Sequence, residues 1–232
     1  MIALFIDLFQ TLSVVLVVAY IVFHTRLTIL LFKGKKGFSS GLILIAIFGL
    51  FSIYGTLGGV NVLGAVSNIR DLGPLAAGLL AGPLVGMGAG LIGALHRYSL
   101  GGFTALSCSL ATVVAGLIGG IVYLSRKRMF PKIVPALLLG ALEPLVHAAL
   151  SLLLARPFEQ AWEVALAFTP AMMLVSAMGL AGFSFDLPPY NETLHVVHLV
   201  REANEFDRTK IFDRKNNTNS FRSQDDFRFR CL

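Results

Sequence analysis

Apolar residues along this chain fall into six long blocks, which short polar stretches separate. The blocks cover residues 2–23, 42–57, 72–95, 103–124, 133–155 and 164–185. Because a transmembrane helix needs about 20 apolar residues, this pattern predicts an all-α, polytopic membrane helical bundle. The first block leads into a basic stretch and a second apolar block, with no small-residue cleavage site behind it. We therefore expect a retained span, not a removed signal peptide.

The third block is rich in glycine and admits two interpretations. Gly82-Pro83 near its middle favours a helix that is broken into two halves. The glycines Gly78, Gly82, Gly86 and Gly90 are spaced four apart, which instead favours one continuous helix packed closely on a neighbour.

Charge along the chain helps to choose between these interpretations. Two basic stretches, residues 24–36 and 125–132, are expected to face the cytoplasm. Three full crossings between them would place them on opposite sides of the membrane. We therefore expect five spans plus a Gly-rich re-entrant or sixth helix, with the N-terminus outside and the C-terminus inside.

The composition excludes a soluble protein. Hydrophobic residues make up 56% of the chain and charged residues only 14%, whereas soluble domains carry about 25% charged residues. The net charge of +6 comes from the short stretches between blocks and from the tail, so it indicates membrane topology and no nucleic-acid partner. We expect a multi-pass protein of the plasma membrane, with the lipid bilayer as its surroundings.

The C-terminal part differs from the rest. Residues 186–232 contain Pro188-Pro189, are rich in Asn, Asp, Arg and Phe, and show no sustained helical or strand periodicity. We expect a transmembrane domain over residues 1–185 and a polar, mostly disordered tail over residues 186–232. No disulfide between Cys108 and Cys231 is expected.

Charged residues at the ends of apolar blocks are the strongest candidates for function, because burying a charge in a membrane is costly. Arg70 and Arg97 each lie at the end of an apolar segment. The planar guanidinium group of arginine presents a fork of N–H donors that matches a carboxylate. Thr104, Cys108 and Thr112 are four residues apart, which places them on one helix face. We predict that these residues meet in one cavity.

Neighbouring residues complete the predicted ligand site. Asn68 and His96 lie next to the two arginines, and the glycines Gly101 and Gly102 allow backbone amides to approach an anion. The predicted ligand-binding set is Asn68, Arg70, His96, Arg97, Gly101, Gly102, Thr104 and Cys108.

Structural roles compete with this hypothesis. Arginines at block ends also extend to lipid headgroups, Asp71 is placed to neutralise Arg70, and a single buried Cys108 is often a packing residue. Glu143 and His147, one turn apart, form a buried polar pair, a proton relay or a hydrogen bond to a neighbouring helix. No hydrolytic triad, metal-ligand cluster or nucleotide fingerprint is visible, so we expect no catalytic residues, no metal and no cofactor.

Several runs of residues together resemble a known family. They are Asn68-Ile69-Arg70, Gly78-Leu79-Leu80-Ala81-Gly82-Pro83, and His96-Arg97-Tyr98-Ser99-Leu100-Gly101-Gly102-Phe103-Thr104-Ala105-Leu106-Ser107-Cys108. These runs closely resemble the five-transmembrane receptor region of LytS/YehU-type sensor histidine kinases, over about residues 1–182. His24-Thr25-Arg26-Leu27, Glu143 and Ala155-Arg156-Pro157 fit as well.

The resemblance implies a receptor that senses a small extracellular metabolite and signals to a kinase. The family members most similar to this chain respond to pyruvate through two arginines and a cysteine, which match Arg70, Arg97 and Cys108. The chain departs from the family pattern at Ala111, where a pocket hydroxyl is expected, and at Val146 and Ser176, where amide side chains are expected.

The resemblance also concerns partners. The family continues into a cytoplasmic kinase part, which residues 186–232 do not resemble, so we expect no phosphorylation by this chain alone. The expected partners are a second copy in a homodimer, or a separate kinase, and a response regulator. A truncated gene product and a stand-alone receptor are both compatible with this pattern.

A second class of function also fits a polytopic bundle. Transporters and the substrate-binding membrane subunits of uptake systems use broken helices around a site at the membrane midplane. Accumulation of labelled solute in proteoliposomes distinguishes transport from sensing. The sequence therefore predicts a carboxylate receptor module, with a small-solute transporter as the alternative and a degenerate fragment as a third reading.

Overall fold

The computed structural model describes residues 2–24, 38–127 and 129–186. The described part contains the helices α1 (Ile2–His24), α3 (Phe38–Leu57), α4 (Leu72–Ala81), α5 (Pro83–Ser99), α6 (Ala105–Ser125), α7 (Ile133–Leu154) and α8 (Phe158–Asp186), and the strands β1 (Val60–Val62) and β2 (Ala65–Ser67). The first basic stretch and the predicted disordered tail lie outside the described residues.

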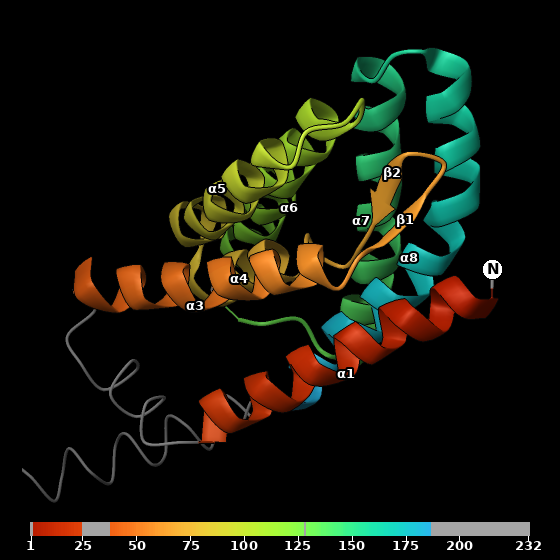
Figure 1. The fold of residues 1–232 in the computed structure, drawn as a ribbon. Coiled ribbons are helices and arrows are strands. Elements are labelled where there is room, and N and C mark those ends of the chain that lie inside the picture. Colours follow the sequence, from red (N-terminus) through yellow and green to blue (C-terminus); the bar gives the residue numbers. More distant parts are fainter. Residues whose placement is uncertain (1, 25–37, 128, 187–232) are drawn as a thin grey trace, which may run out of the picture. The chain divides into compact units, whose positions relative to one another are not determined.

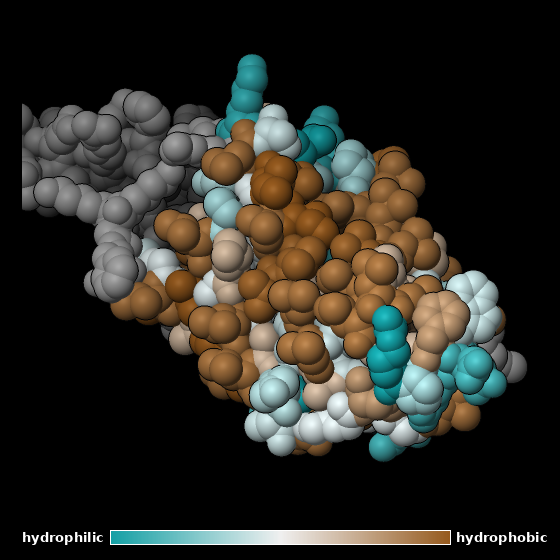
Figure 2. All heavy atoms as spheres, turned by 90° about the horizontal axis from the view of Figure 1, so that it is seen from above, coloured by the Kyte–Doolittle hydropathy of each residue, from teal (hydrophilic) through white to brown (hydrophobic). Residues whose placement is uncertain are grey.

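Five of these helices, α1, α3, α6, α7 and α8, are long and apolar enough to cross a membrane. Large apolar side chains on their outer faces are exposed, as expected of helix faces that contact lipid. Leu138 and Leu153 of α7, for example, are 62% and 69% exposed. Most of the face seen in Figure 2 is coloured hydrophobic. The predicted all-α membrane bundle is confirmed.

The helices pack mainly as neighbouring pairs. α5 lies along α6, and α7 lies along α8 (Figure 1). Buried apolar side chains such as Leu12, Phe48, Leu75 and Phe183 come from four different helices and form one hydrophobic core.

The third apolar block is broken, as one of the two interpretations predicted. α4 ends at Ala81, and Gly82 has a φ of +95°, a conformation that glycine adopts readily. Pro83 then occupies the start of α5, where its missing N–H costs no helical hydrogen bond. The prediction of one continuous helix is wrong, because α4 turns back at Gly82 and packs against α5.

The glycines nevertheless allow close packing between helices, although they lie on two helices and not on one. A Cβ atom on Gly86 would lie 2.7 Å from the Cα atom of Gly78, and one on Gly90 would lie 2.8 Å from the backbone oxygen of Thr112. A Cβ atom on Gly120 would likewise lie 2.6 Å from the Cβ atom of Pro83. The small residues of α4 and α5 therefore let both helices approach the α6 backbone.

The contacts of α5 resolve the topology that the charge pattern requires. Gly41 near the start of α3 faces Val85, and Gly120 near the end of α6 faces Pro83. The start of α3 and the end of α6 therefore lie at the same end of the bundle, beside the start of α5. In the sequence, one basic stretch precedes the start of α3 and the other follows α6, so the shared position of these two helix ends agrees with the positive-inside rule.

A short β-hairpin between α3 and α4 was not predicted from the sequence. β1 and β2 pair antiparallel, with Val60 opposite Ser67. Leu63 and Gly64 form the turn, both with positive φ, as a tight hairpin requires. Gln160 of α8 donates a hydrogen bond of 3.0 Å to the carbonyl of Leu63, which fixes the hairpin tip.

Several predicted boundaries differ from the structure, and two of them concern polar residues. α5 continues through His96 to Ser99, beyond the predicted end at residue 95. α8 begins at Phe158, not at residue 164. Glu159 lies in its first turn, where the helix dipole favours negative charge, and Glu163 follows in the second turn.

The close approach of α5 and α6 makes a testable prediction. Gly90→Ala places a methyl group against backbone atoms at 2.8–2.9 Å, so it should destabilise the protein by about 1–3 kcal/mol. Thermal unfolding in detergent measures this loss.

Gly41→Ala is the matched control, because its new methyl group lies 3.8 Å from the nearest side-chain atom, in ordinary contact. Equal melting temperatures for Gly90→Ala and Gly41→Ala would contradict the close packing of α5 on α6.

Candidate functional site

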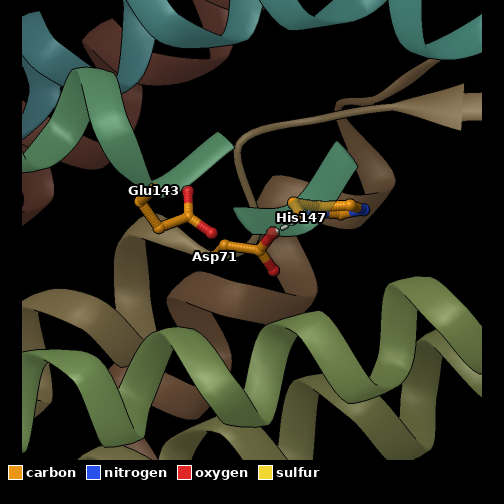
Figure 3. Close-up of side chains that lie close together, drawn as sticks. All are labelled: Asp71, Glu143 and His147. Carbon is orange, nitrogen blue, oxygen red and sulfur yellow. Dashed lines mark hydrogen bonds and ion pairs between the residues drawn. The ribbon is translucent and has the colours of Figure 1, made fainter. Parts of the chain in front are cut away.

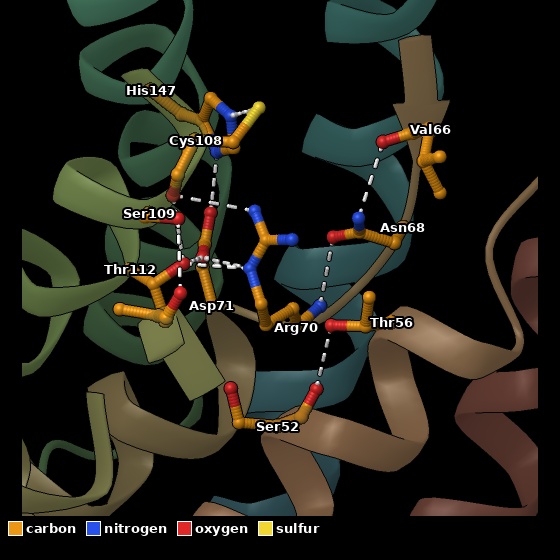
Figure 4. Close-up of polar contacts among 11 residues, drawn as sticks. Ser52, Thr56, Val66, Asn68, Arg70, Asp71, Cys108, Ser109, Thr112 and His147 are labelled. Atoms are coloured by element: carbon orange, nitrogen blue, oxygen red, sulfur yellow. Dashed lines mark hydrogen bonds and ion pairs between the residues drawn. The ribbon is translucent and has the colours of Figure 1, made fainter. Parts of the chain in front are cut away.

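Arg70 lies in the short non-helical segment between β2 and α4. Its side chain is fully buried, with 0% exposure. Nε donates a hydrogen bond of 2.6 Å to Thr112 Oγ1, and Nη2 donates one of 3.3 Å to the Cys108 carbonyl (Figure 4). Nη1 is buried without an acceptor among the described residues. Arg70 therefore binds α6 and retains a spare donor.

Asn68 holds the segment that presents Arg70. Its side-chain oxygen accepts a 3.2 Å hydrogen bond from the Arg70 backbone N–H, and its amide donates one of 3.1 Å to the Val66 carbonyl. Asparagine commonly stabilises turns through such local bonds to the backbone. The predicted site residue Asn68 thus lies next to Arg70, and its contacts position the backbone.

Arg97 enters the same region from α5. It is only 1% exposed, so the alternative in which it extends to lipid headgroups is wrong. Nη1 donates a hydrogen bond of 2.6 Å to the Gly101 carbonyl, and Nη2 donates one of 3.0 Å to Thr104 Oγ1. Nε is buried without an acceptor, and no carboxylate within the described residues forms an ion pair with this guanidinium.

The two arginines converge on one face of α6. Thr104 binds Arg97, while Cys108 and Thr112 bind Arg70. Thr104 precedes the first residue of α6, and the three share a face, as their spacing predicted. Arg70 Nη2 donates to the backbone carbonyl of Cys108, and Arg97 donates to Thr104 one turn earlier, so both guanidinium groups bond to residues of this face.

Asp71 neutralises Arg70, as the structural alternative predicted. Its Oδ1 lies 3.5 Å from Arg70 Nε and 2.7 Å from the Thr112 hydroxyl. The carboxylate is 2% exposed. Arg70 therefore has a buried counter-ion, and Arg97 does not.

His147 of α7 joins Asp71 to Cys108. Its Nδ1 bonds to Asp71 Oδ2, and its Nε2 lies 3.2 Å from Cys108 Sγ (Figure 4). Of the roles considered for His147, the hydrogen bond to a neighbouring helix is confirmed. The sequence did not reveal this chain of contacts, because the three residues lie on three separate segments of the chain.

Glu143 lies beside this network, one turn from His147. Figure 3 shows its carboxyl group directed toward Asp71. Donor atoms of Asp71, Glu143 and His147 all lie within 4.8 Å of one another, and all three types bind divalent cations. The sequence did not reveal this group. Asp71 and His147 are already bonded to each other, and the Arg70 cation lies beside the same carboxylate.

A cavity adjoins the network between α6, α7, α8 and β2. Cys108 and His147 open on it, together with Thr104, which holds Arg97. The remaining lining is Ala65, Val66, Pro144, Ala148, Ser151, Val164, Ala165, Phe168, Thr169 and Met172. The cavity therefore has polar groups on both α6 and α7, and its α8 wall is largely apolar. Neither Arg70 nor Arg97 is among its lining residues.

The remaining predicted site residues lie at the periphery. Gly101 and Gly102 form the exposed turn between α5 and α6, with φ of +69° and +90°. The Gly101 carbonyl accepts from Arg97, and its amide donates to the Tyr98 carbonyl, so this amide does not face an anion. His96 is half-buried and lies next to Arg97 on α5, about 100° around the helix.

Comparison with known proteins agrees with this architecture. The family model described as 5TMR of 5TMR-LYT matches residues 25–187. The sensor histidine kinase BtsS of Escherichia coli (strain K12) is 36% identical over 181 residues, which are 76% of this chain and 32% of BtsS. The sensor protein LytS of Bacillus subtilis (strain 168) is 32% identical over 197 residues, 77% of this chain and 33% of LytS.

These relatives are longer proteins, and this chain spans about a third of their length. The sensor histidine kinase YpdA of Escherichia coli (strain K12) is 39% identical over a shorter region of 93 residues, 39% of this chain and 16% of YpdA. No solved structure matches the chain. The family match covers all the described residues from α3 to α8, including both arginines. The chain is a multi-pass plasma-membrane protein and belongs to the 5TMR-LYT family, the five-transmembrane receptor regions of LytS-type sensors.

Proposed function

We propose that this chain is the ligand-sensing module of a two-component system and that it binds a small carboxylate such as pyruvate. The carboxylate would lie beside Arg97 and Arg70, with the rest of the molecule in the cavity between α6, α7 and α8. The signal would pass to a kinase, in a homodimer or as a separate protein, and then to a response regulator.

The unpaired charge of Arg97 carries this proposal. A buried ion costs several kcal/mol unless a partner compensates it. No carboxylate among the described residues pairs with this guanidinium, and it donates hydrogen bonds to the neutral oxygens of Gly101 and Thr104. Arg97 Nε and Arg70 Nη1 are also buried donors without acceptors. A carboxylate supplies the missing negative charge and the missing acceptors together.

The adjoining cavity favours a small organic acid over an inorganic anion. Thr104 and Cys108 line it and bond to Arg97 and Arg70, respectively, and apolar side chains such as Val164 and Phe168 supply much of the remaining lining. Such a combination suits a ligand with a charged end and a short apolar end. Ala111, buried at 2% exposure, offers no hydroxyl where the family pattern has one, so this chain would recognise its ligand with one polar contact fewer.

Signalling requires two helix packings that bind the ligand with different affinity. Arg70 and Arg97 hold α6 from two different segments, so a ligand that takes over their donors would alter both attachments. The glycine contacts along α6 lack interlocking side chains, which lowers the resistance to sliding against α4 and α5. We propose that α6 shifts relative to these helices when the ligand binds.

The two arginines provide the direct test. Arg97→Ala and Arg70→Ala each remove a charge-assisted contact worth about 1.5–3 kcal/mol, so pyruvate affinity should fall about tenfold or more. Isothermal titration calorimetry on the purified protein measures this change.

Arg156→Ala is the matched control, because Arg156 is exposed and donates only to nearby backbone carbonyls. Its pyruvate affinity should equal that of the unchanged protein. Unchanged affinity in both Arg97→Ala and Arg70→Ala would exclude the proposed site.

Transport is the competing function, because α4 and α5 form a broken helix next to the site, as in many transporters. A sensor should bind pyruvate without moving it. Proteoliposomes containing this chain should take up labelled pyruvate no faster than empty liposomes, and accumulation that depends on Arg97 would replace sensing with transport.

A further inference from the structure

Three buried side chains, Asp71, His147 and Cys108, form a continuous network that binding of a carboxylate by arginine does not require. Asp71 bonds to one ring nitrogen of His147, and the other ring nitrogen lies 3.2 Å from Cys108 Sγ. The three residues are 2%, 9% and 6% exposed, respectively, so water does not compete for these contacts.

This order of groups is that of an activated nucleophile. A carboxylate orients the imidazole and stabilises its protonated form, and the imidazole accepts the proton of the thiol. The thiolate, not the thiol, attacks electrophiles. A structural cysteine in an apolar interior lacks such partners and is inert.

Basic side chains also lie close to Cys108. Arg70 Nη2 donates to the Cys108 carbonyl, and Arg97 donates to Thr104, one turn before Cys108. His147 contacts the sulfur itself. An imidazolium and two guanidinium groups together stabilise a thiolate.

The sulfur is placed where a bound acid would carry its second functional group. Cys108 lines the cavity one helical turn beyond Thr104, which holds Arg97. Four residues of α6 advance about 6 Å along its axis, so a short acid whose carboxylate bonds to Arg97 can extend its next carbon toward Cys108. The apolar lining beyond it accepts a methyl group.

We propose that Cys108 is a nucleophile that captures a 2-oxo acid as a reversible thiohemiketal; this inference rests on the proposed function. The thiolate sulfur adds to the ketone carbon, and the carbon–oxygen π bond breaks. The resulting alkoxide takes the proton from the His147 imidazolium, which returns to neutral imidazole. No oxidant or leaving group is required, and the reverse reaction releases the ligand unchanged.

Covalent capture explains how such a site would select its ligand. A 2-hydroxy acid such as lactate has the same carboxylate and nearly the same shape, but its second carbon is not electrophilic. The arginines alone bind both acids, whereas Cys108 reacts only with the 2-oxo acid. The network therefore converts a general carboxylate site into one that distinguishes the oxidation state of the ligand.

Nuclear magnetic resonance of pyruvate labelled with ¹³C at the ketone carbon tests the adduct. The full chain carrying Cys231→Ser retains Cys108 as its only thiol. Bound pyruvate should lose its ketone resonance and gain one of a tetrahedral carbon, distinct from that of pyruvate hydrate. Adding Cys108→Ser should abolish this signal.

The outcomes separate the two proposals. Pyruvate that binds with its ketone resonance intact overturns covalent capture and leaves the carboxylate receptor standing. Pyruvate that does not bind at all overturns both.

The ratio of pyruvate affinity to lactate affinity tests the roles of His147 and Asp71. Because lactate forms no adduct, general damage to the site weakens both ligands and cancels in this ratio. Cys108→Ser and His147→Gln should each lower the ratio about tenfold or more. Asp71 acts through His147 as a positioning residue, so Asp71→Asn should lower the ratio as well. A ratio that stays unchanged in Cys108→Ser and His147→Gln overturns the proposal, even where both affinities fall.

Discussion

The structure depends on holding two guanidinium groups inside an apolar bundle. Arg70 and Arg97 are 0% and 1% exposed, and each buried ion costs several kcal/mol unless polar partners compensate it. Thr104, Thr112 and the turn at Gly101 supply those partners. The two arginines are compensated unequally, because Asp71 pairs with Arg70, whereas Arg97 has no acidic partner within the described part of the chain. This inequality is the physical basis for proposing an anionic ligand.

The irregular elements of the fold, the hairpin and the helix break, position the two arginines. The hairpin β1–β2 and the non-helical residues after it deliver Arg70 to the middle of α6, where Thr112 receives it. The break at Gly82 lets α4 be short and lets α5 return along α6, which brings Arg97 to the other end of the same face. Backbone that leaves helical structure inside a membrane protein is tolerated only where protein or a cavity surrounds it. Both conditions hold here, since Asn68 satisfies the Arg70 backbone and the cavity lies alongside.

Much of this arrangement could be predicted from the sequence, because its causes are local. Spans follow from apolar blocks of membrane length, the break from Gly82-Pro83, and the shared face of Thr104, Cys108 and Thr112 from helical spacing. The hairpin could not be predicted, since strands of three residues in a polar stretch carry no periodic signal. The contacts of His147 with Asp71 and Cys108 span 76 and 39 residues, and only the packing of α7 on α6 creates them. Family resemblance pointed to Arg70, Arg97 and Cys108, and it gave no role to His147.

The central claim is that a ligand carboxylate supplies the negative charge that no carboxylate of the described residues supplies to Arg97. A ligand that binds the folded state raises its thermal stability, so the melting temperature in detergent reports this directly when pyruvate is compared with pyruvamide, its neutral amide. The account predicts that pyruvate raises the melting temperature with increasing concentration and that pyruvamide raises it much less at the same concentration. Equal shifts with both compounds, or no shift with either, would contradict it.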